Sequence, residues 1–346
     1  MANSSKKGSI KVLGIDIAKH SFQLHGVDEG GHIVFKKKLT RNKLTEVMAN
    51  LPPCVIGMEA CGGAHHWYRV FTEMGHSVHL IAPQFVKPFV KSNKNDVADA
   101  EAICEAVARP SMRFVPAKSI EQQDVQALHR IRSRLMANRT AQSNQIRGLL
   151  LEYGIIIPKG MSQLRKRIPE ILEDDENNLT GMFRGMLSEL YDEITHLDER
   201  IVSLEKKLES VSKQSEDCQL LLTIPGIGLL TATALVAAVG DISVFKNGRE
   251  MAAWLGLVPR QHSTGGKPTL LGISKRGDKY LRSLLIHGGR SVVQRADKHG
   301  DYRSQWVSRL EQRRGKNISA VAVANKNART AWAILSKKRT YAAASA

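Results

Sequence analysis

The chain has 346 residues, more than a single hydrophobic core usually holds, so two or three domains are expected. Its formal net charge of +18 favours a polyanionic partner. No apolar stretch reaches the roughly 18 residues that a membrane-spanning helix needs, and MANSSKKGS carries no apolar signal segment. The four cysteines are too scattered for a CxxC metal site or a disulfide framework. We therefore expect a cytoplasmic protein that works without a membrane.

The positive charge is concentrated towards the C-terminus. Residues 1–121 carry 16 basic against 11 acidic side chains, residues 122–218 carry 14 against 16, and residues 219–346 carry 21 against 6. We predict three domains with these bounds: an α/β domain, a helical linker that also oligomerises, and a basic, mostly helical domain.

The N-terminal third has the pattern of an α/β fold. An apolar run over 10–17 predicts a strand buried on both faces, and SFQLHGV and HIVFKKKL, separated by DEGG, predict two more strands. A helix near 40–50, the strand CVIGME, a helix near 64–75, the strand SVHLI and a helix from Asp96 follow. Three strands in a meander, then alternating helices and strands, are the order of a ribonuclease H-like, or RuvC-like, fold.

Four carboxylates are the first chemical focus. Asp16 and Glu59 end apolar strands, where ligand sites of α/β sheets commonly lie, and Asp96 and Asp99 share one face of the next helix. Buried carboxylates repel each other unless a hard cation offsets their charge, as in nucleases that use two metal ions. The alternative for Asp96 and Asp99 is a structural role, since acids in a first turn complement the helix dipole and Asn95 is a suitable N-cap.

Two long helical patterns occupy the central region. Residues 122–153 are basic, and we expect Arg130 and Arg134 to bind nucleic acid, although a solvated helix surface is the alternative. The second pattern alternates spacings of four and three and predicts a coiled coil, either a hairpin with the first helix or a seam between chains. Its positions are Phe183, Leu187, Leu190, Ile194, Leu197, Ile201, Leu204, Leu208 and Val211.

The sequence IPGIG begins the basic C-terminal region. Gly226 and Gly228 lie between two helical runs, as in a helix-hairpin-helix motif whose backbone N–H groups hold a phosphate. A tight turn between packed helices needs the same glycines, so this alternative stays open.

The second chemical focus runs from 254 to 290. Ser263 and Thr264 precede Gly265 and Gly266 within a cluster of cations that suits phosphate chemistry. A serine hydroxyl needs a base, a cation or a metal to become a nucleophile, and a glycine-rich turn is the alternative reading. Ser274 is a competing hydroxyl. The cations expected to bind nucleic acid are Arg260, Lys267, Lys275, Arg276, Lys279 and Arg282.

Several ordered motifs together carry a family resemblance. They are GIDIAKHSFQLHGVD, GMEACGGAHHW, APQFVKPFVKSNKNDVADAEAI, IPGIG and GLVPRQHSTGGK through ISKRGDKYLR. From about residue 10 to 335 the chain resembles the DEDD transposases of bacterial insertion sequences, the group that includes the Piv-type DNA invertases.

The resemblance implies a function and its parts. Asp16, Glu59, Asp96 and Asp99 would bind Mg²⁺, as two ions, and Ser263 would join DNA covalently. A noncoding RNA would pair with donor and target DNA to choose the sites, and the chain would act as a dimer or tetramer at the nucleoid. The predicted mechanism is serine attack on a phosphate, with a phosphoserine link that preserves bond energy for rejoining.

Two other functions compete with this prediction. A hydrolytic RuvC-like junction resolvase would use water in place of serine, and a nonenzymatic architectural protein would bind nucleic acid without cutting it. A sugar kinase-like ATPase is disfavoured because the sequence has neither a P-loop nor a second glycine-rich phosphate motif.

Overall fold

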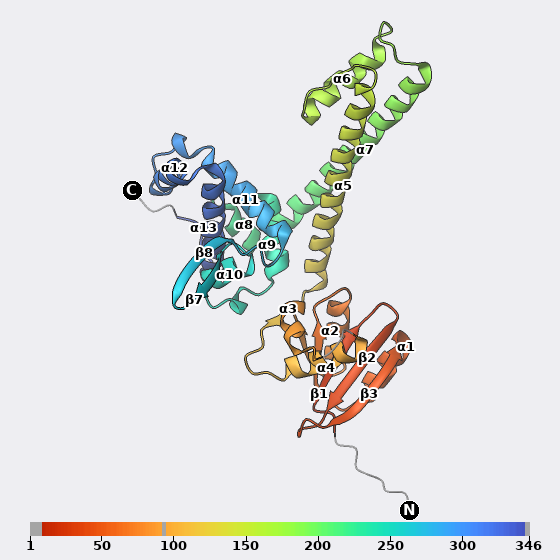
Figure 1. Cartoon of the computed structure of the whole chain (residues 1–346), viewed down its shortest axis with the longest axis vertical. Helices are drawn as coiled ribbons and strands as arrows, with labels where there is room; N and C mark the ends of the chain where they lie inside the picture. The colour runs from red at the N-terminus through yellow and green to blue at the C-terminus, as the bar shows by residue number, and fades with distance from the viewer. Residues whose placement is uncertain (1–8, 92–94, 343–346) are drawn as a thin grey trace, which may run out of the picture. The chain divides into compact units, whose positions relative to one another are not determined.

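The computed structural model describes residues 9–91 and 95–342 (Figure 1). The chain divides into two compact units, Met1–Lys118 and Ser119–Ala346. The N-terminal segment MANSSKKG, for which no signal peptide is predicted, lies outside the described residues. The division into three domains stays a prediction.

The first unit is built on a six-stranded sheet of order β3-β2-β1-β4-β5-β6. β1, β2 and β3 are antiparallel, β4 and β5 run parallel to β1, and β6 is antiparallel to β5. The predicted α/β character is confirmed, and the strand order is consistent with a ribonuclease H-like fold. The strands are Val12–Ile17, Ser21–Val27, Ile33–Thr40, Val55–Glu59, Ser77–Ile81 and Phe114–Val115.

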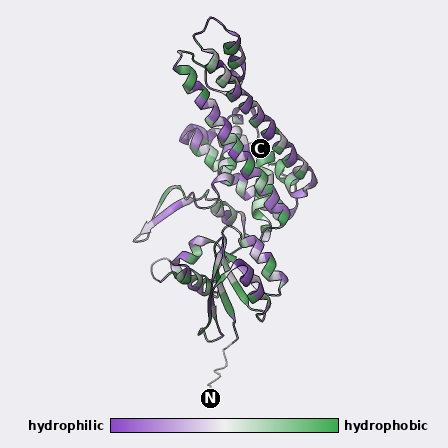
Figure 2. Ribbon diagram, turned by 90° about the vertical axis from the view of Figure 1, so that its right-hand side faces the viewer, coloured by the Kyte–Doolittle hydropathy of each residue, from purple (hydrophilic) through white to green (hydrophobic). Residues whose placement is uncertain are grey.

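The sheet and helices of this unit enclose an apolar core. Leu13, Ile15 and Leu24 are fully buried, and Phe22 meets Trp67 edge to face at 5.1 Å between ring centroids. Figure 2 shows that hydrophobic residues dominate the central strands. The helices are α1 (Arg41–Ala49), α2 (Ala64–Glu73), α3 (Pro83–Val86), the 3-10 helix η1 (Lys87–Phe89) and α4 (Asp96–Val107).

Two glycines let α4 lie directly on the sheet. A Cβ atom on Gly14 of β1 would come within 2.2 Å of the Ala100 carbonyl oxygen and 2.5 Å of the Cys104 nitrogen. A Cβ atom on Gly57 of β4 would come within 2.8 Å of Val107. No other residue type allows this approach, so these glycines fix where α4 crosses the two strands.

The second unit begins with a long antiparallel helix pair, α5 (Ile120–Leu151) and α7 (Gly181–Gln214), joined through α6 (Met161–Glu173). A capping box of Ser119 and Gln122 starts α5. The periodic residues Phe183, Leu187, Ile194, Ile201 and Leu208 of α7 are buried. The hairpin with the first helix, one of the two predicted alternatives, is therefore present within the chain.

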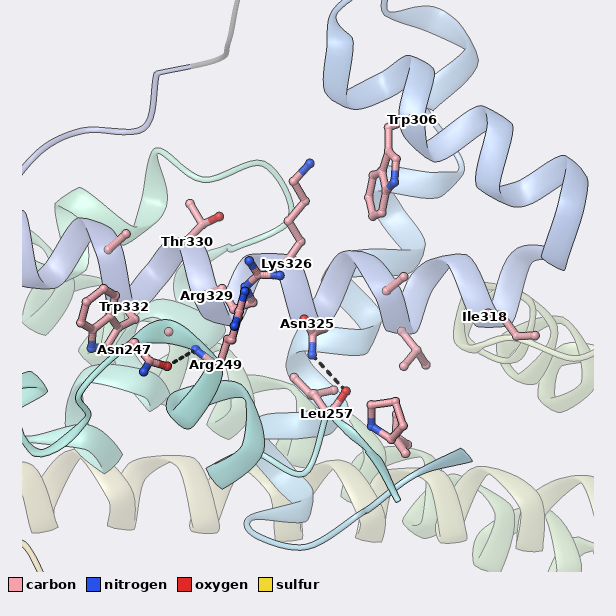
Figure 3. Close-up of a pocket in the computed structure, with 16 residues that line it drawn as sticks. Asn247, Arg249, Leu257, Trp306, Ile318, Asn325, Lys326, Arg329, Thr330 and Trp332 are labelled. Carbon is pink, nitrogen blue, oxygen red and sulfur yellow. Dashed lines mark hydrogen bonds between the residues drawn. The ribbon is translucent and has the colours of Figure 1, made fainter. Parts of the chain in front are cut away.

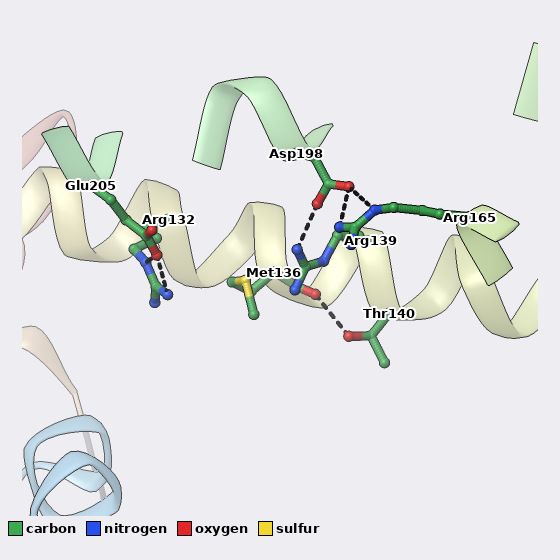
Figure 4. A network of polar contacts seen from close by, with 7 residues as sticks. All are labelled: Arg132, Met136, Arg139, Thr140, Arg165, Asp198 and Glu205. Atoms are coloured by element: carbon green, nitrogen blue, oxygen red, sulfur yellow. Dashed lines mark hydrogen bonds and ion pairs between the residues drawn. The ribbon is translucent and has the colours of Figure 1, made fainter. Parts of the chain in front are cut away.

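Charged side chains fix the register of this helix pair (Figure 4). Arg132 donates to Glu205 at 2.8 Å, and Asp198 accepts from both Arg139 at 2.6 Å and Arg165 of α6. These three arginines therefore serve packing within the chain. Arg130 and Arg134 are exposed and form no ion pair among the described residues.

The rest of the second unit is a helical body with one two-stranded sheet. Its mostly helical character confirms the prediction, whereas the hairpin of β7 (Pro259–Thr264) and β8 (Lys267–Ile273) was not predicted. The helices are α8 (Glu216–Leu222), α9 (Leu229–Val239), η2 (Ile242–Val244), α10 (Gly248–Trp254), α11 (Lys279–Val293), η3 (Ala296–Lys298), α12 (Tyr302–Arg314) and α13 (Lys316–Lys337).

The IPGIG loop packs tightly between α8 and α9. Gly226 has a φ of +87°, and its carbonyl oxygen would lie 1.8 Å from a Cβ atom on Gly288 of α11. The buried Arg303 and Asn327 both donate to the Pro225 carbonyl oxygen, at 3.2 and 3.1 Å. Packing therefore requires Gly226, whereas Gly228 is exposed with open space around it. None of the helices described here combines the length and apolar character that crossing a bilayer requires.

The glycine contact under α4 gives a testable prediction. Gly14→Ala should destabilise the first unit by about 3 kcal/mol, because the new methyl group meets backbone atoms that cannot rotate away. Hydrogen exchange, followed peptide by peptide, reports this unit separately. Gly62→Ala is the control, since its Cβ atom would meet nothing within 4 Å. Equal protection of β1 in Gly14→Ala and the wild type would contradict the prediction.

Candidate functional site

Strand register brings Asp16 and Glu59 side by side. Ile15 of β1 pairs with Met58 of β4 in a parallel ladder, so the next residues along are neighbours at the carboxyl end of the sheet. Side chains alternate along a strand, so Asp16 faces the same side as Gly14, and Glu59 the same side as Gly57. That side is the one covered by α4.

The direction of α4 brings the other two acids to the same edge. Gly14 meets Ala100, so Asp16, two residues further along β1, lies towards the preceding turn of α4, which carries Asp96 and Asp99. The Asn95 side chain accepts from the Ala98 N–H at 2.8 Å, and this confirms the predicted N-cap. Asp96 and Asp99 therefore begin a capped helix, as the structural alternative predicts, at the end of α4 nearest Asp16, and their metal-binding role stays a prediction.

The negative charges of the other three carboxylates act on the pKa of Asp16. Burial raises the pKa of Asp16 from 3.8 to about 6, and the negative charges of Asp99, Asp96 and Glu59 add to this rise. Asp96 is exposed and pairs with Lys38 at 3.5 Å. The structure thus brings together all four acids predicted from the sequence at one end of the sheet.

The donor chemistry suits a hard divalent cation, because all four side chains offer carboxylate oxygens. Within residues 9–91 and 95–342, no group of three or more His, Cys, Asp or Glu side chains is close enough to hold a metal ion. The carboxylates therefore supply the donor atoms that a metal site needs, but in this structure they are not close enough together to hold an ion.

A pocket of about 420 Å³ opens next to these acids. It is lined by the residues that directly follow Asp16 and Glu59, together with Arg41 and Trp67, whose guanidinium carbon and ring centroid are 5.0 Å apart. Lys19 and Arg41 give this pocket two positive charges beside the carboxylates. An anionic ligand can therefore approach the strand ends from this side.

Ser263 lies in the second unit, on the β7–β8 hairpin. Gly265 and Gly266 form the two-residue turn with φ values of +57° and +76°, as a type I′ turn requires. Every side chain of β7 is exposed, and the Ser263 hydroxyl accepts from Gln261 Nε2 at 2.7 Å. The Gly-Gly pair between two extended runs was the signal that would have predicted this hairpin.

The other predicted residues of this region divide by exposure. Ser274 is half-buried, and its hydroxyl accepts from the Arg276 N–H at 3.4 Å. Arg282 is buried and donates to the Leu255 carbonyl oxygen at 3.2 Å, so it supports the hairpin base, and its contact with nucleic acid stays a prediction. The remaining cations are exposed: Arg260, Lys267, Lys275, Arg276 and Lys279.

Sequence reasoning missed a buried polar link between α5, α9 and α11. His129 lies 3.0 Å from the Tyr280 hydroxyl and 3.0 Å from the Thr233 hydroxyl. Burial lowers the pKa of His129 to about 4, and the charge of Arg132 adds to this effect. The histidine is therefore neutral at physiological pH and holds the long helix to the helical body.

The raised pKa of Asp16 predicts that replacing this carboxylate with a neutral side chain stabilises the folded chain, by an amount that depends on pH. Between pH 4 and 6 the Asp16 carboxyl binds more protons in the folded chain than in the unfolded chain, so its contribution to stability falls as pH rises through this window. In EDTA at pH 7.5, Asp16→Asn should stabilise the first unit by on the order of 1–3 kcal/mol, and by much less at pH 4.

Chemical denaturation of the two proteins at both pH values measures this difference. Asp28→Asn is the control, because a hydrogen bond from the His32 backbone lowers the pKa of Asp28 and its removal should not stabilise. A gain in Asp16→Asn that is equal at the two pH values would contradict the electrostatic account.

Comparisons with known proteins identify the family. Residues 13–155 match a DEDD transposase family model, and residues 218–305 match the model described as "Transposase IS116/IS110/IS902 family". A probable family 20 transposase of Pseudomonas aeruginosa is 50% identical over 95% of this chain and 98% of its own length. The transposase for insertion sequence element IS1111A of Coxiella burnetii is 50% identical over 96% of this chain and 91% of its own.

A more distant relative matches only part of the chain. The pilin gene-inverting protein of Moraxella bovis is 31% identical over 43% of this chain and 45% of its own length. The resemblance read from the sequence motifs is thus confirmed by the two family models and by relatives that cover nearly the whole chain. The chain belongs to the IS116/IS110/IS902 family of insertion-sequence transposases, enzymes that cut and join DNA.

Proposed function

We propose that this transposase cuts and rejoins DNA with two chemical centres, the four carboxylates of the first unit and Ser263 of the second. The observation that carries the proposal is the gathering of Asp16, Glu59, Asp96 and Asp99 near one sheet edge, where burial raises the pKa of Asp16 to about 6 and the negative charges of the other three acids add to this rise. A fold gains no stability from carboxylates that repel one another, so the arrangement favours a chemical role.

Asp16, Glu59, Asp96 and Asp99 are the residues that would hold Mg²⁺, as two ions. When bound, the ions would supply Lewis-acid stabilisation of the scissile phosphate. Lys19 and Arg41 in the adjoining pocket would orient the DNA backbone through its phosphate oxygens. The carboxylates and the two cations together would hold the phosphate at the strand ends.

Ser263 would form the covalent link. Its hydroxyl oxygen bonds to phosphorus, the bond from phosphorus to the leaving deoxyribose oxygen breaks, and the serine proton passes to a base while the leaving oxygen takes up a proton. Gln261, the hydrogen-bond donor to Ser263, is neutral and takes up no proton, so activation would come from the carboxylate centre. Attack by a deoxyribose hydroxyl on the phosphoserine reverses the exchange and needs no ATP.

The exposed cations would bind the phosphate backbone of the nucleic acid. Arg130 and Arg134 on α5 are exposed, as are the cations on and directly after the hairpin: Arg260, Lys267, Lys275, Arg276 and Lys279. The exposed Gly228 would let a phosphate approach the start of α9, as in a helix-hairpin-helix. This chemistry reads charge but not sequence, so a noncoding RNA that pairs with donor and target DNA would choose the sites. DNA that flanks the gene should then contain a noncoding stretch matching both.

Substitution of the hydroxyls tests the nucleophile. Ser263→Ala should lower strand exchange by roughly 10³-fold or more and remove every protein–DNA adduct from denaturing gels, because no other group would bond to phosphorus. Thr264→Val should keep the adduct and serves as the matched control. Normal cutting by Ser263→Ala would support the hydrolytic resolvase instead. Unchanged recombination in Asp16→Asn with Asp99→Asn would support a nonenzymatic binder.

A coiled-coil seam between chains is the proposed basis of a dimer or tetramer. Leu190, Leu197, Leu204 and Val211, spaced by seven along α7, are only half-buried within the chain, so a second helix can cover them. Leu197→Glu with Leu204→Glu should lower the oligomeric state in sedimentation experiments. Val202→Glu, on an exposed position of α7 away from this stripe, should leave the oligomeric state unchanged. Identical sedimentation of both variants would contradict the seam.

A further inference from the structure

A second, larger pocket lies in the helical body, and neither the four acids nor Ser263 lines it. It has a volume of about 1030 Å³ and runs along α13, below Trp306 of α12 and beside the base of the β7–β8 hairpin (Figure 3). We call it the α13 groove. Its volume is at the top of the range of about 300–1,000 Å³ that is usual for small-molecule sites, so it can take a segment of a polymer.

The charges of the α13 groove are of one sign. Arg249, Lys326 and Arg329 line it, and none of its lining residues is acidic. Arg249 and Arg329 are exposed and form no ion pair in the part of the chain that the structure describes. Burial lowers the pKa of Lys326, and the charges of Arg303 and Arg329 add to this effect. Among the described residues these cations have no acidic partner, so an anionic ligand would complement them.

The floor of the groove is apolar and carries an aromatic ring. Ile318, which is 55% exposed, and Val321 line it from α13, and Pro259 and Ile273 from the hairpin base. The Trp306 ring is half-buried, with Lys326 Nζ 4.5 Å from its centroid, and Figure 3 shows Lys326 and Trp306 on the same side of α13, between Trp332 and Ile318. Aromatic faces and apolar floors bind the faces of unpaired bases, which a duplex keeps covered.

We infer that the α13 groove binds single-stranded nucleic acid, with a base stacked on Trp306 and phosphates held by Arg249 and Arg329. Cations with an interleaved aromatic ring are the combination by which proteins hold single strands without reading their sequence. A single strand complements both features of the groove, because its phosphates match the positive charge and its bases match the apolar floor.

The groove lies beside the base of the hairpin that carries Ser263, and this position suggests what a bound strand does there. Pro259 and Ile273 pair across the hairpin base, and Ser263 is four residues along β7, about 13 Å away at the usual strand rise. A strand in the groove therefore runs beside the hairpin that carries the proposed nucleophile. This role rests on the proposed function, whereas the binding chemistry itself does not require Ser263.

Binding of short labelled oligonucleotides tests the inference. Fluorescence anisotropy of the full chain in EDTA, without cleavage, compares single-stranded DNA, single-stranded RNA and a duplex of the same sequence. Trp306→Leu should weaken single-strand binding by roughly 5- to 100-fold, because the stacked base loses its partner, and Trp306→Phe should restore most of it. The duplex should respond less. The tighter of the two single strands identifies the source of the ligand.

Matched controls separate this site from general charge. Arg249→Gln with Arg329→Gln should weaken single-strand binding and reduce its salt dependence by a slope of about one to one and a half. Lys206→Gln with Lys207→Gln removes the same charge from exposed positions of α7 and should have little effect. Trp254→Leu is the aromatic control, since Trp254 is 37% exposed and lies outside the groove.

Three results would overturn the inference. They are wild-type binding in Trp306→Leu, equal losses in Trp306→Leu and Trp254→Leu, and a change in sedimentation without a change in binding, which would make the groove a protein interface.

Ser263→Ala should bind single strands normally and form no adduct. Normal binding by the groove variants with loss of adduct in Ser263→Ala rejects the groove alone. Weak binding by those variants without any adduct in the wild type rejects the nucleophile alone.

Discussion

The close approach of α4 to β1 and β4 is the contact on which the arrangement of the four acids in the first unit depends. Gly14 and Gly57 let helix backbone and side chains lie where a Cβ atom would otherwise sit. Because side chains alternate along a strand, the same face that accepts α4 also carries Asp16 and Glu59. One packing contact therefore decides that four acids from three separate elements share one sheet edge.

This arrangement opposes stability. Burial and three neighbouring charges raise the pKa of Asp16 to about 6, so the ionised form is disfavoured in the folded chain. The rest of the first unit offsets this with an apolar core and aromatic contacts such as that of Phe22 with Trp67. Strain of this kind, concentrated at strand ends, is typical of sites that bind a charged ligand.

The second unit separates structural charge from available charge. Arg132, Arg139 and Arg165 meet acids on α7, Arg282 and Arg303 donate to backbone carbonyl groups, and all five are used inside the fold. The exposed cations of the hairpin, and Arg249 and Arg329 of the α13 groove, form no ion pair with any residue that the structure describes. Net charge alone therefore overstates the surface that is free for a polyanion, and only the contacts show which residues remain.

The sequence by itself determined the α/β first unit, most of its element bounds, the family and the identity of the four acids, because strand and helix periodicity and short motifs are local signals. It did not decide between a packing role and a phosphate-binding role for Gly226, or which arginines of α5 are free, because both depend on partners far along the chain. It also did not predict the β7–β8 hairpin, because a Gly-Gly pair beside hydroxyls and cations fits a phosphate-binding loop as well as the two-residue turn that Gly265 and Gly266 form. Only the tertiary structure showed the α13 groove, since residues from 247 to 333 meet there through packing that no local pattern encodes.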